Sequence, residues 1–170
     1  MLATLIPAAL TKSQSEFIAE HPGFHLLKPP TASEETELRH DTLQVSHPAG
    51  VPPSHIVPSS HAWQATRIAK QPDSPYPDRI SVGRAADCDI VLRFAVVSKH
   101  HAQFLVGSDG SLQMHDLGSV NGTYHNGKRL EEGQRVTLAP RDLISFGGVH
   151  CELVDAVGLY QKAGGGGDKA

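Results

Sequence analysis

The sequence predicts an all-β fold, a two-sheet β-sandwich, on the strength of three observations. Short runs rich in Val, Ile, Leu and Phe follow one another at close spacing over residues 62–154. Turn-favouring pairs such as Asn126-Gly127 separate several of these runs. Almost none of this region has the pattern of a helix. Many short strands joined by Gly-containing turns are typical of a sandwich.

The expected strands follow in order along this half of the chain. Their ranges are 62–69, 79–82, 89–92, 102–106, 111–116, 122–124, 128–130, 134–138, 142–146 and 149–154. Asn126-Gly127 lies between two of them and is the pair that type I′ hairpins prefer, so we expect a tight hairpin at that point.

The first sixty residues predict an extension that is only partly ordered. Ser13-Gln14-Ser15-Glu16 has the form of a capping box, so we expect a short helix near residues 14–21 and a strand after it at 24–27. Residues 31–60 are rich in Pro, Ser, His and acidic residues, which predicts a linker. The apolar start of the chain lacks basic residues and contains a proline, so it predicts neither a signal peptide nor a membrane span.

These patterns divide the chain into three parts. We expect an N-terminal extension over 1–60, a compact domain over 61–156 and a flexible, Gly-rich tail over 157–170. Eleven of the twelve prolines precede residue 78, whereas nine of the sixteen glycines fall between residues 83 and 148. This shift in composition is typical of an extended arm followed by a domain with many turns.

The composition excludes several classes of function. The net charge is −3 and no segment is strongly basic, which argues against nucleic acid as a partner, and no segment indicates a membrane. The two cysteines lie in apolar stretches, as is usual for buried thiols in a reducing cytoplasm. Eleven histidines are present, but neither they nor the cysteines have metal-ligand spacing, so we expect no metal and no cofactor.

Short polar motifs occur in a fixed order over residues 83–147. They are Gly83-Arg84, Asp89-Ile90, Ser98-Lys99-His100-His101-Ala102, Asp116-Leu117-Gly118-Ser119-Val120-Asn121-Gly122-Thr123, Asn126-Gly127 and Asp142-Leu143-Ile144-Ser145-Phe146-Gly147. At these residues the chain resembles the forkhead-associated (FHA) domain, over roughly residues 60–156. The resemblance implies an FHA-like sandwich that binds phosphothreonine peptides.

The motifs Gly83-Arg84 and Ser98-Lys99 suit an anion. Gly83 at a strand end permits an unusual backbone angle, and the guanidinium of Arg84 can offer two parallel donors to a phosphate. Ser98 supplies a hydroxyl and Lys99 an ammonium. Taken alone, Arg84 is more typical of a surface arginine after a turn, and Ser98-Lys99 also fits a polar turn followed by a solvated lysine. The resemblance implies that Arg84 is the main phosphate anchor and that Ser98 and Lys99 also contact the phosphate.

The third loop and one histidine complete the expected site. An asparagine amide can grip a peptide backbone, and the resemblance implies this role for Asn121. Many family members have Thr at the position of Val120, so only a backbone contact is expected there. Ser119, Gly122 and Thr123 belong to the structural motif that shapes the loop, and the resemblance implies that His101 braces the loops through a hydrogen bond.

The sequence therefore predicts a phosphothreonine-peptide-binding adaptor in Ser/Thr-kinase signalling, linked to a kinase indirectly through its phosphorylated partner. A phosphate-independent interaction scaffold on the same sandwich is the alternative. An enzyme is not expected, because no acid/base pair, Gly-rich nucleotide loop or metal motif is present, and Ser98 lacks the sequence context of a catalytic nucleophile.

Overall fold

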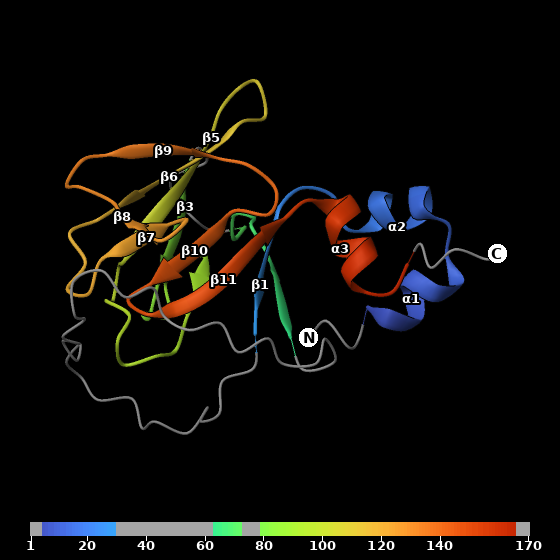
Figure 1. Cartoon of the computed structure of the whole chain (residues 1–170), viewed down its shortest axis with the longest axis horizontal. Helices are drawn as coiled ribbons and strands as arrows, with labels where there is room; N and C mark the ends of the chain where they lie inside the picture. The colour runs from blue at the N-terminus through green and yellow to red at the C-terminus, as the bar shows by residue number, and fades with distance from the viewer. Residues whose placement is uncertain (1–4, 30–62, 73–78, 166–170) are drawn as a thin grey trace.

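A computed structural model describes residues 5–29, 63–72 and 79–165 of the chain. Two β-sheets pack face to face, and three short helices lie beside one end of them (Figure 1). One sheet has the strand order β2-β1-β11-β10-β7-β8 and the other β4-β3-β5-β6-β9. Strand β4 runs parallel to β3, whereas the strands on either side of β5 run antiparallel to it. The predicted two-sheet sandwich is confirmed.

The strands occur where the sequence predicts them, with ends shifted by no more than two residues. Their bounds are β1 His25–Lys28, β2 Gln64–Arg67, β3 Arg79–Gly83, β4 Ile90–Val91, β5 Ala102–Val106, β6 Leu112–Asp116, β7 Thr123–His125, β8 Lys128–Arg129, β9 Arg135–Leu138, β10 Leu143–Phe146 and β11 Val149–Val154. The expected hairpin joins β7 to β8, with Asn126 and Gly127 both at positive φ, as a type I′ turn requires.

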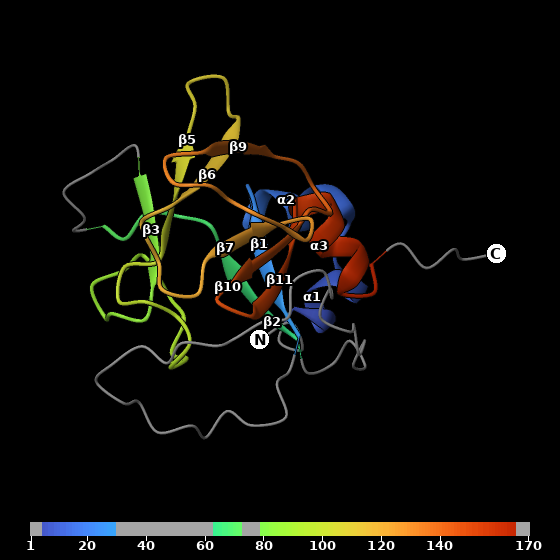
Figure 2. The ribbon, with the colours of Figure 1, turned by 60° about the vertical axis from the view of Figure 1, so that its left-hand side comes forward.

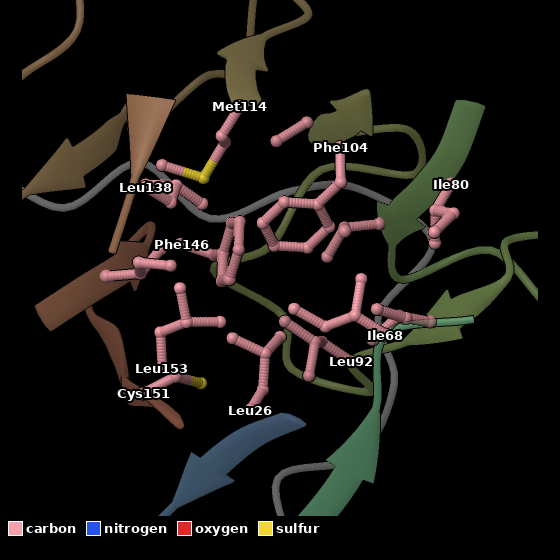
Figure 3. Close-up of a cluster of buried hydrophobic side chains, with 14 of the residues drawn as sticks. Leu26, Ile68, Ile80, Leu92, Phe104, Met114, Leu138, Phe146, Cys151 and Leu153 are labelled. Carbon is pink, nitrogen blue, oxygen red and sulfur yellow. The ribbon is translucent and has the colours of Figure 1, made fainter. Parts of the chain in front are cut away.

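The main core lies between the two sheets (Figure 3). Phe104 from β5 and Phe146 from β10 are fully buried, and their rings meet edge to face with centroids 6.3 Å apart. Leu26 and Leu153 from one sheet face Met114 from the other. This packing fixes the two sheets relative to each other, so that loops from both are held at the same end of the sandwich.

Strand β1 lies inside its sheet, although the sequence places it in an extension. Leu26 pairs with Leu153 of β11, and Lys28 pairs with Gln64 of β2. The expected boundary near residue 61 therefore separates β1 from both of its neighbours, and the division into extension and domain is corrected here. The reason is physical, because strand pairing over such a separation leaves no local signal in the sequence. The predicted linker over 31–60 lies outside the described residues.

A second, smaller core attaches the helices to the outer face of this sheet. Helices α1 (Ile6–Thr11), α2 (Gln14–Glu20) and α3 (Ala156–Lys162) surround Leu27, whose side chain points away from the main core. Figure 2 shows the three helices grouped beside β1 and β11. The predicted capping box of α2 is confirmed, since Ser13 and Glu16 bond each other reciprocally. No helix in the described ranges is both long and apolar enough to cross a membrane.

Helix α3 corrects the prediction that a flexible tail begins at residue 157. The carboxylate of Asp155 caps the helix by accepting a hydrogen bond from the Gly158 N–H at 2.7 Å. Leu159 is fully buried, and the ring of Tyr160 lies 5.3 Å from the ring of Phe17. The C-terminal segment is therefore ordered by contact with the N-terminal helices. Residues 166–170 lie beyond the part of the tail that the structure describes.

Candidate functional site

Three loops meet at one end of the sandwich, namely those that follow β3, precede β5 and precede β7. The Arg84 N–H donates to the Ser98 carbonyl at 2.9 Å, which ties the first loop to the second. The Val120 N–H donates to the Ser98 hydroxyl at 3.1 Å, which ties the third loop to the second. Ser98 thus stands between the other two loops, and the structure brings together residues that the sequence separates.

Gly83 is required by a close approach of two backbones. A Cβ atom at this position would lie 2.0 Å from the Lys99 carbonyl oxygen and 2.9 Å from the Cys88 sulfur. Its φ is not positive, so the expected unusual backbone angle is absent. The predicted importance of this glycine therefore has a different cause, because no side chain fits between β3 and the Ser98-Lys99 loop.

The three side chains expected at the phosphate lie around this junction. Arg84 is half-buried, and its Nε donates to the Val97 carbonyl at 3.1 Å, which holds the guanidinium along the second loop. The Ser98 hydroxyl accepts from Val120, and no described residue accepts a hydrogen bond from it. The Lys99 side chain is exposed, and its ammonium has no hydrogen bond or ion pair within the described ranges. The site thus combines an oriented arginine, a hydroxyl donor and an exposed cation.

His101 holds the second and third loops together from below. Its Nδ1 accepts from the Ser98 N–H at 3.1 Å, so the proton is on Nε2, which donates to the Gly122 carbonyl at 3.2 Å. The ring is fully buried and meets Phe146 edge to face at 5.8 Å. Burial lowers the pKa of His101, although the Gly122 bond and the Asp116 charge act in the opposite direction. The neutral imidazole therefore has the bracing geometry that the resemblance implies.

Asp116 organises the third loop. From the sequence it is named only as part of a motif and is assigned no role of its own. Its carboxylate accepts from the hydroxyls of Ser119 and Thr123, both at 2.6 Å, and from the Ser119 and Gly118 N–H groups at 2.8 and 2.9 Å. Burial raises the pKa of Asp116, but these hydrogen bonds outweigh it and the pKa is lowered. An aspartate at a strand end before Gly-Ser is the signal that could have identified it.

Asn121 and Val120 occupy different positions in the third loop. Asn121 is 5% exposed, and its Nδ2 donates to the Val96 carbonyl at 2.8 Å, so part of the amide links two loops. The Val120 side chain is 47% exposed, while its N–H is used by Ser98. Gly122, with φ of 80°, then turns the chain into β7. The loop thus presents an apolar side chain to solvent above an anchored amide.

Asp89 anchors the far end of the loop that carries Arg84, and it too was not identified as a site residue from the sequence. Its carboxylate accepts from the Ser81 N–H at 2.7 Å and the Gln71 N–H at 2.9 Å, and forms an ion pair with Lys70 at 3.1 Å. Burial raises the pKa of Asp89, but the hydrogen bonds outweigh it and the pKa falls to about 2. The loop is therefore fixed at both ends.

One group of metal-ligating side chains comes together next to the site, and the sequence spacing does not predict it. Potential ligand atoms of Asp87, Cys88 and His100 lie within 4.8 Å of one another. The Cys88 thiol, however, donates to the Lys99 carbonyl at 3.3 Å, and burial together with nearby carboxylates raises its pKa to about 11. A metal needs the thiolate. These contacts therefore indicate that Cys88 is a hydrogen-bonded thiol. Neither Cys88 nor Cys151 forms a disulfide, and both are buried.

Comparison with known proteins finds relatives that match part of this chain in sequence. An ABC transporter ATP-binding/permease protein of Mycobacterium tuberculosis is 40% identical over 73 residues, which cover 40% of this chain and 8% of the transporter. The serine/threonine-protein kinase RAD53 of Saccharomyces cerevisiae is 36% identical over 77 residues, which cover 44% of this chain and 9% of the kinase. The chain thus spans less than a tenth of either relative.

The fold has a matching solved structure. The crystal structure of the FHA domain of the CT664 protein from Chlamydia trachomatis aligns with a TM-score of 0.50 at 22% identity, over 78% of this chain and 98% of that one. The family model of the FHA domain matches residues 80–147, which include the three loops of the site. The resemblance seen in the sequence is confirmed, because residues 80–147 match the FHA domain family and the chain shares its fold with an FHA domain.

Proposed function

We propose that this protein binds phosphothreonine-containing peptides or proteins at the junction of the three loops. The observation that carries the proposal is the state of Ser98, which is 9% exposed and whose hydroxyl oxygen is already bonded by the Val120 N–H. That bond leaves the hydroxyl hydrogen to donate elsewhere, and no described residue accepts it. A phosphate oxygen is a suitable acceptor, because two cationic residues belong to the same junction: Lys99 follows Ser98, and the Arg84 N–H is bonded to the Ser98 carbonyl.

In the proposed binding mode, three side chains donate hydrogen bonds to the phosphate. Arg84 is the main anchor, since its guanidinium is held by the Val97 carbonyl and can offer parallel donors. Ser98 donates a single short hydrogen bond, and Lys99 supplies a second positive charge from solvent. Hydrogen bonds to charged groups contribute about 1.5–3 kcal/mol each. After the costs of association, an affinity near micromolar follows.

The peptide backbone is proposed to lie over the third loop. Asn121 is oriented by its bond to the Val96 carbonyl and is the residue we assign to clamping the peptide. Val120 contributes exposed apolar surface next to it. Ser119, Gly122 and Thr123 shape this loop above Asp116. The assignment of Asn121 rests on the family resemblance together with its position.

The protein is proposed to act as a cytoplasmic adaptor in Ser/Thr-kinase signalling and not as an enzyme. FHA domains are non-catalytic binding modules, and the proposed site needs neither a metal nor a cofactor. Two buried free thiols suit a reducing compartment, which is also where kinases produce phosphothreonine. The kinase is an indirect partner, because the phosphorylated protein is what binds.

An oriented phosphothreonine peptide library, followed by calorimetry on selected peptides, tests the proposal. We expect binding of the phosphothreonine form, weaker binding of phosphoserine and no measurable binding of the unphosphorylated form. Arg84→Ala should remove binding, and Arg67→Ala on the edge strand β2 is the matched control. Equal affinity for phosphorylated and unphosphorylated peptides would favour the alternative, a phosphate-independent scaffold, and would overturn the proposal.

A further inference from the structure

Arg129 lies against the third loop of the proposed site, although it comes from the neighbouring hairpin. It is an exposed residue of β8 and pairs with Tyr124 of β7. A Cβ atom at Gly122 would lie 2.5 Å from Nε, 3.1 Å from Cζ and 3.2 Å from Nη2 of Arg129. The guanidinium therefore occupies the space that a side chain at Gly122 would fill, beside Asn121.

The charge of Arg129 is not neutralised within the described ranges. No described acidic residue forms an ion pair with it, and no hydrogen bond holds it. Several other cations are engaged, since Lys12, Lys70 and Lys162 each contact a carboxylate. An exposed guanidinium that lies against the backbone of a loop and has no acidic partner can form an ion pair with a carboxylate of the ligand.

The distance from the phosphate position to Arg129 fits a short stretch of bound peptide. The Val120 N–H is bonded to the Ser98 hydroxyl, and Gly122 follows two residues later. The distance from Val120 to Gly122 is therefore at most about 7 Å. An extended peptide advances about 3.3 Å per residue. A side chain within about three residues of the phosphothreonine can therefore reach the guanidinium.

We infer that Arg129 is a specificity residue, which favours phosphothreonine peptides that carry an aspartate or glutamate within about three residues of the phosphothreonine. The inference rests on the proposed function and narrows its substrate class. The planar guanidinium offers parallel donors to the carboxylate of the ligand. Because the pair forms at an exposed position, its contribution is modest and decreases with salt.

The test compares pairs of peptides that differ only in having glutamate or glutamine at one position. A phosphothreonine peptide carries glutamate, or the isosteric glutamine, in turn at each flanking position, and calorimetry at low salt gives the affinity ratio. We expect a preference of about two- to fivefold for glutamate at one position, as for exposed ion pairs. Arg129→Gln should remove this preference, and Arg129→Glu should reverse it in favour of a lysine-containing peptide.

Lys128→Gln is the matched control, because it changes the charge equally one residue away. Adjacent strand residues point to opposite faces, so Lys128 does not share the position of Arg129 against the loop. The preference should survive in Lys128→Gln, and thermal melts should show all variants folded. Two outcomes would overturn this inference and leave the proposed function standing. One is phosphate-dependent binding with the same affinity for glutamate and glutamine peptides, and the other is an equal effect of Arg129→Gln and Lys128→Gln. Binding without any phosphate dependence overturns the proposed function and this inference together.

Discussion

The Val120 N–H donates a hydrogen bond to the hydroxyl of Ser98 at 3.1 Å, across 22 residues of sequence. The contact joins the loop before β5 to the loop before β7. It also occupies one lone pair of the hydroxyl, so that the hydroxyl hydrogen points away from Val120. A serine that would otherwise be a polar turn residue becomes an oriented donor, and the first prediction follows from this geometry.

Ser98→Ala should lower the affinity for a phosphothreonine peptide by roughly ten- to a hundredfold, because one hydrogen bond to a charged group contributes about 1.5–3 kcal/mol. The free energy of unfolding should fall by only about 1 kcal/mol, since a single hydrogen bond to Val120 is lost. Calorimetry and urea unfolding measure the two effects. Ser108→Ala, in an exposed turn after β5, is the control, and an unchanged affinity in Ser98→Ala would remove the hydroxyl from the site.

His101→Ala should act on stability first and on binding second. The substitution removes a fully buried ring, together with its bonds to the Ser98 N–H and the Gly122 carbonyl. We expect a loss of about 2–4 kcal/mol in the free energy of unfolding, as for other buried hydrogen-bonded side chains. Arg84→Ala should show the opposite pattern, with binding lost and the melting temperature retained. The reverse outcome for this pair of variants would exchange the two roles.

Acidification from pH 7 to pH 5 should destabilise the protein through buried histidines. Burial lowers the pKa of His25 to about 4, whereas an unfolded histidine titrates near 6.5. Between these values the unfolded state binds the proton and the folded state does not, so stability falls as pH falls below 6.5. His25 alone should contribute a loss of about 2 kcal/mol by pH 5.

Urea unfolding at both pH values measures this loss, and His25→Gln should reduce the difference between them. The lowered pKa of Asp89 does not interfere, because stability linked to a carboxylate with a pKa of about 2 is lost only below its ordinary value of 3.8. A free energy of unfolding that is the same at pH 7 and pH 5 would contradict the buried, neutral state of His25.

Phe17→Ala should destabilise the whole domain although it lies in the N-terminal helix α2. The ring is fully buried in the second core, where it contacts Tyr160 of α3. Truncation of a buried phenylalanine costs about 3–5 kcal/mol. Phosphopeptide affinity should be retained at temperatures where the variant is folded. Ile18→Ala, at a half-buried position on the same helix, should cost less, and equal stability of Phe17→Ala and the wild type would show that the helices are not part of the folding unit.

Local signals predicted the strands and one of the helices. Ser13 and Glu16 formed the capping box of α2, and Asn126-Gly127 formed the β7–β8 turn, because both structures depend on neighbours in sequence. Helix α1 is not among the elements that the sequence predicts. Its Pro7 lies in the first turn, where a proline costs no hydrogen bond.

Long-range contacts could not be predicted in the same way. Helix α3 depends on Leu159 packing into a core shared with Phe17, at the other end of the chain, so its sequence alone resembled a tail. The site residues were predictable as a set because their motifs occur in an ordered series. Their mutual geometry was not predictable. Gly83 is required by its close approach to Lys99, and Asp116 bonds three residues of its own loop.

The proposed function requires phosphate-dependent binding at the three loops. Amide chemical shifts of the isotope-labelled protein, titrated with a phosphothreonine peptide and its unphosphorylated form, locate the binding residues. We expect that only the phosphorylated peptide shifts the amides of Arg84, Ser98, Lys99 and residues 119–122, while α1, α2 and α3 are unaffected. Equal shifts with both peptides, or shifts centred on the helices or on an outer sheet face, would contradict it.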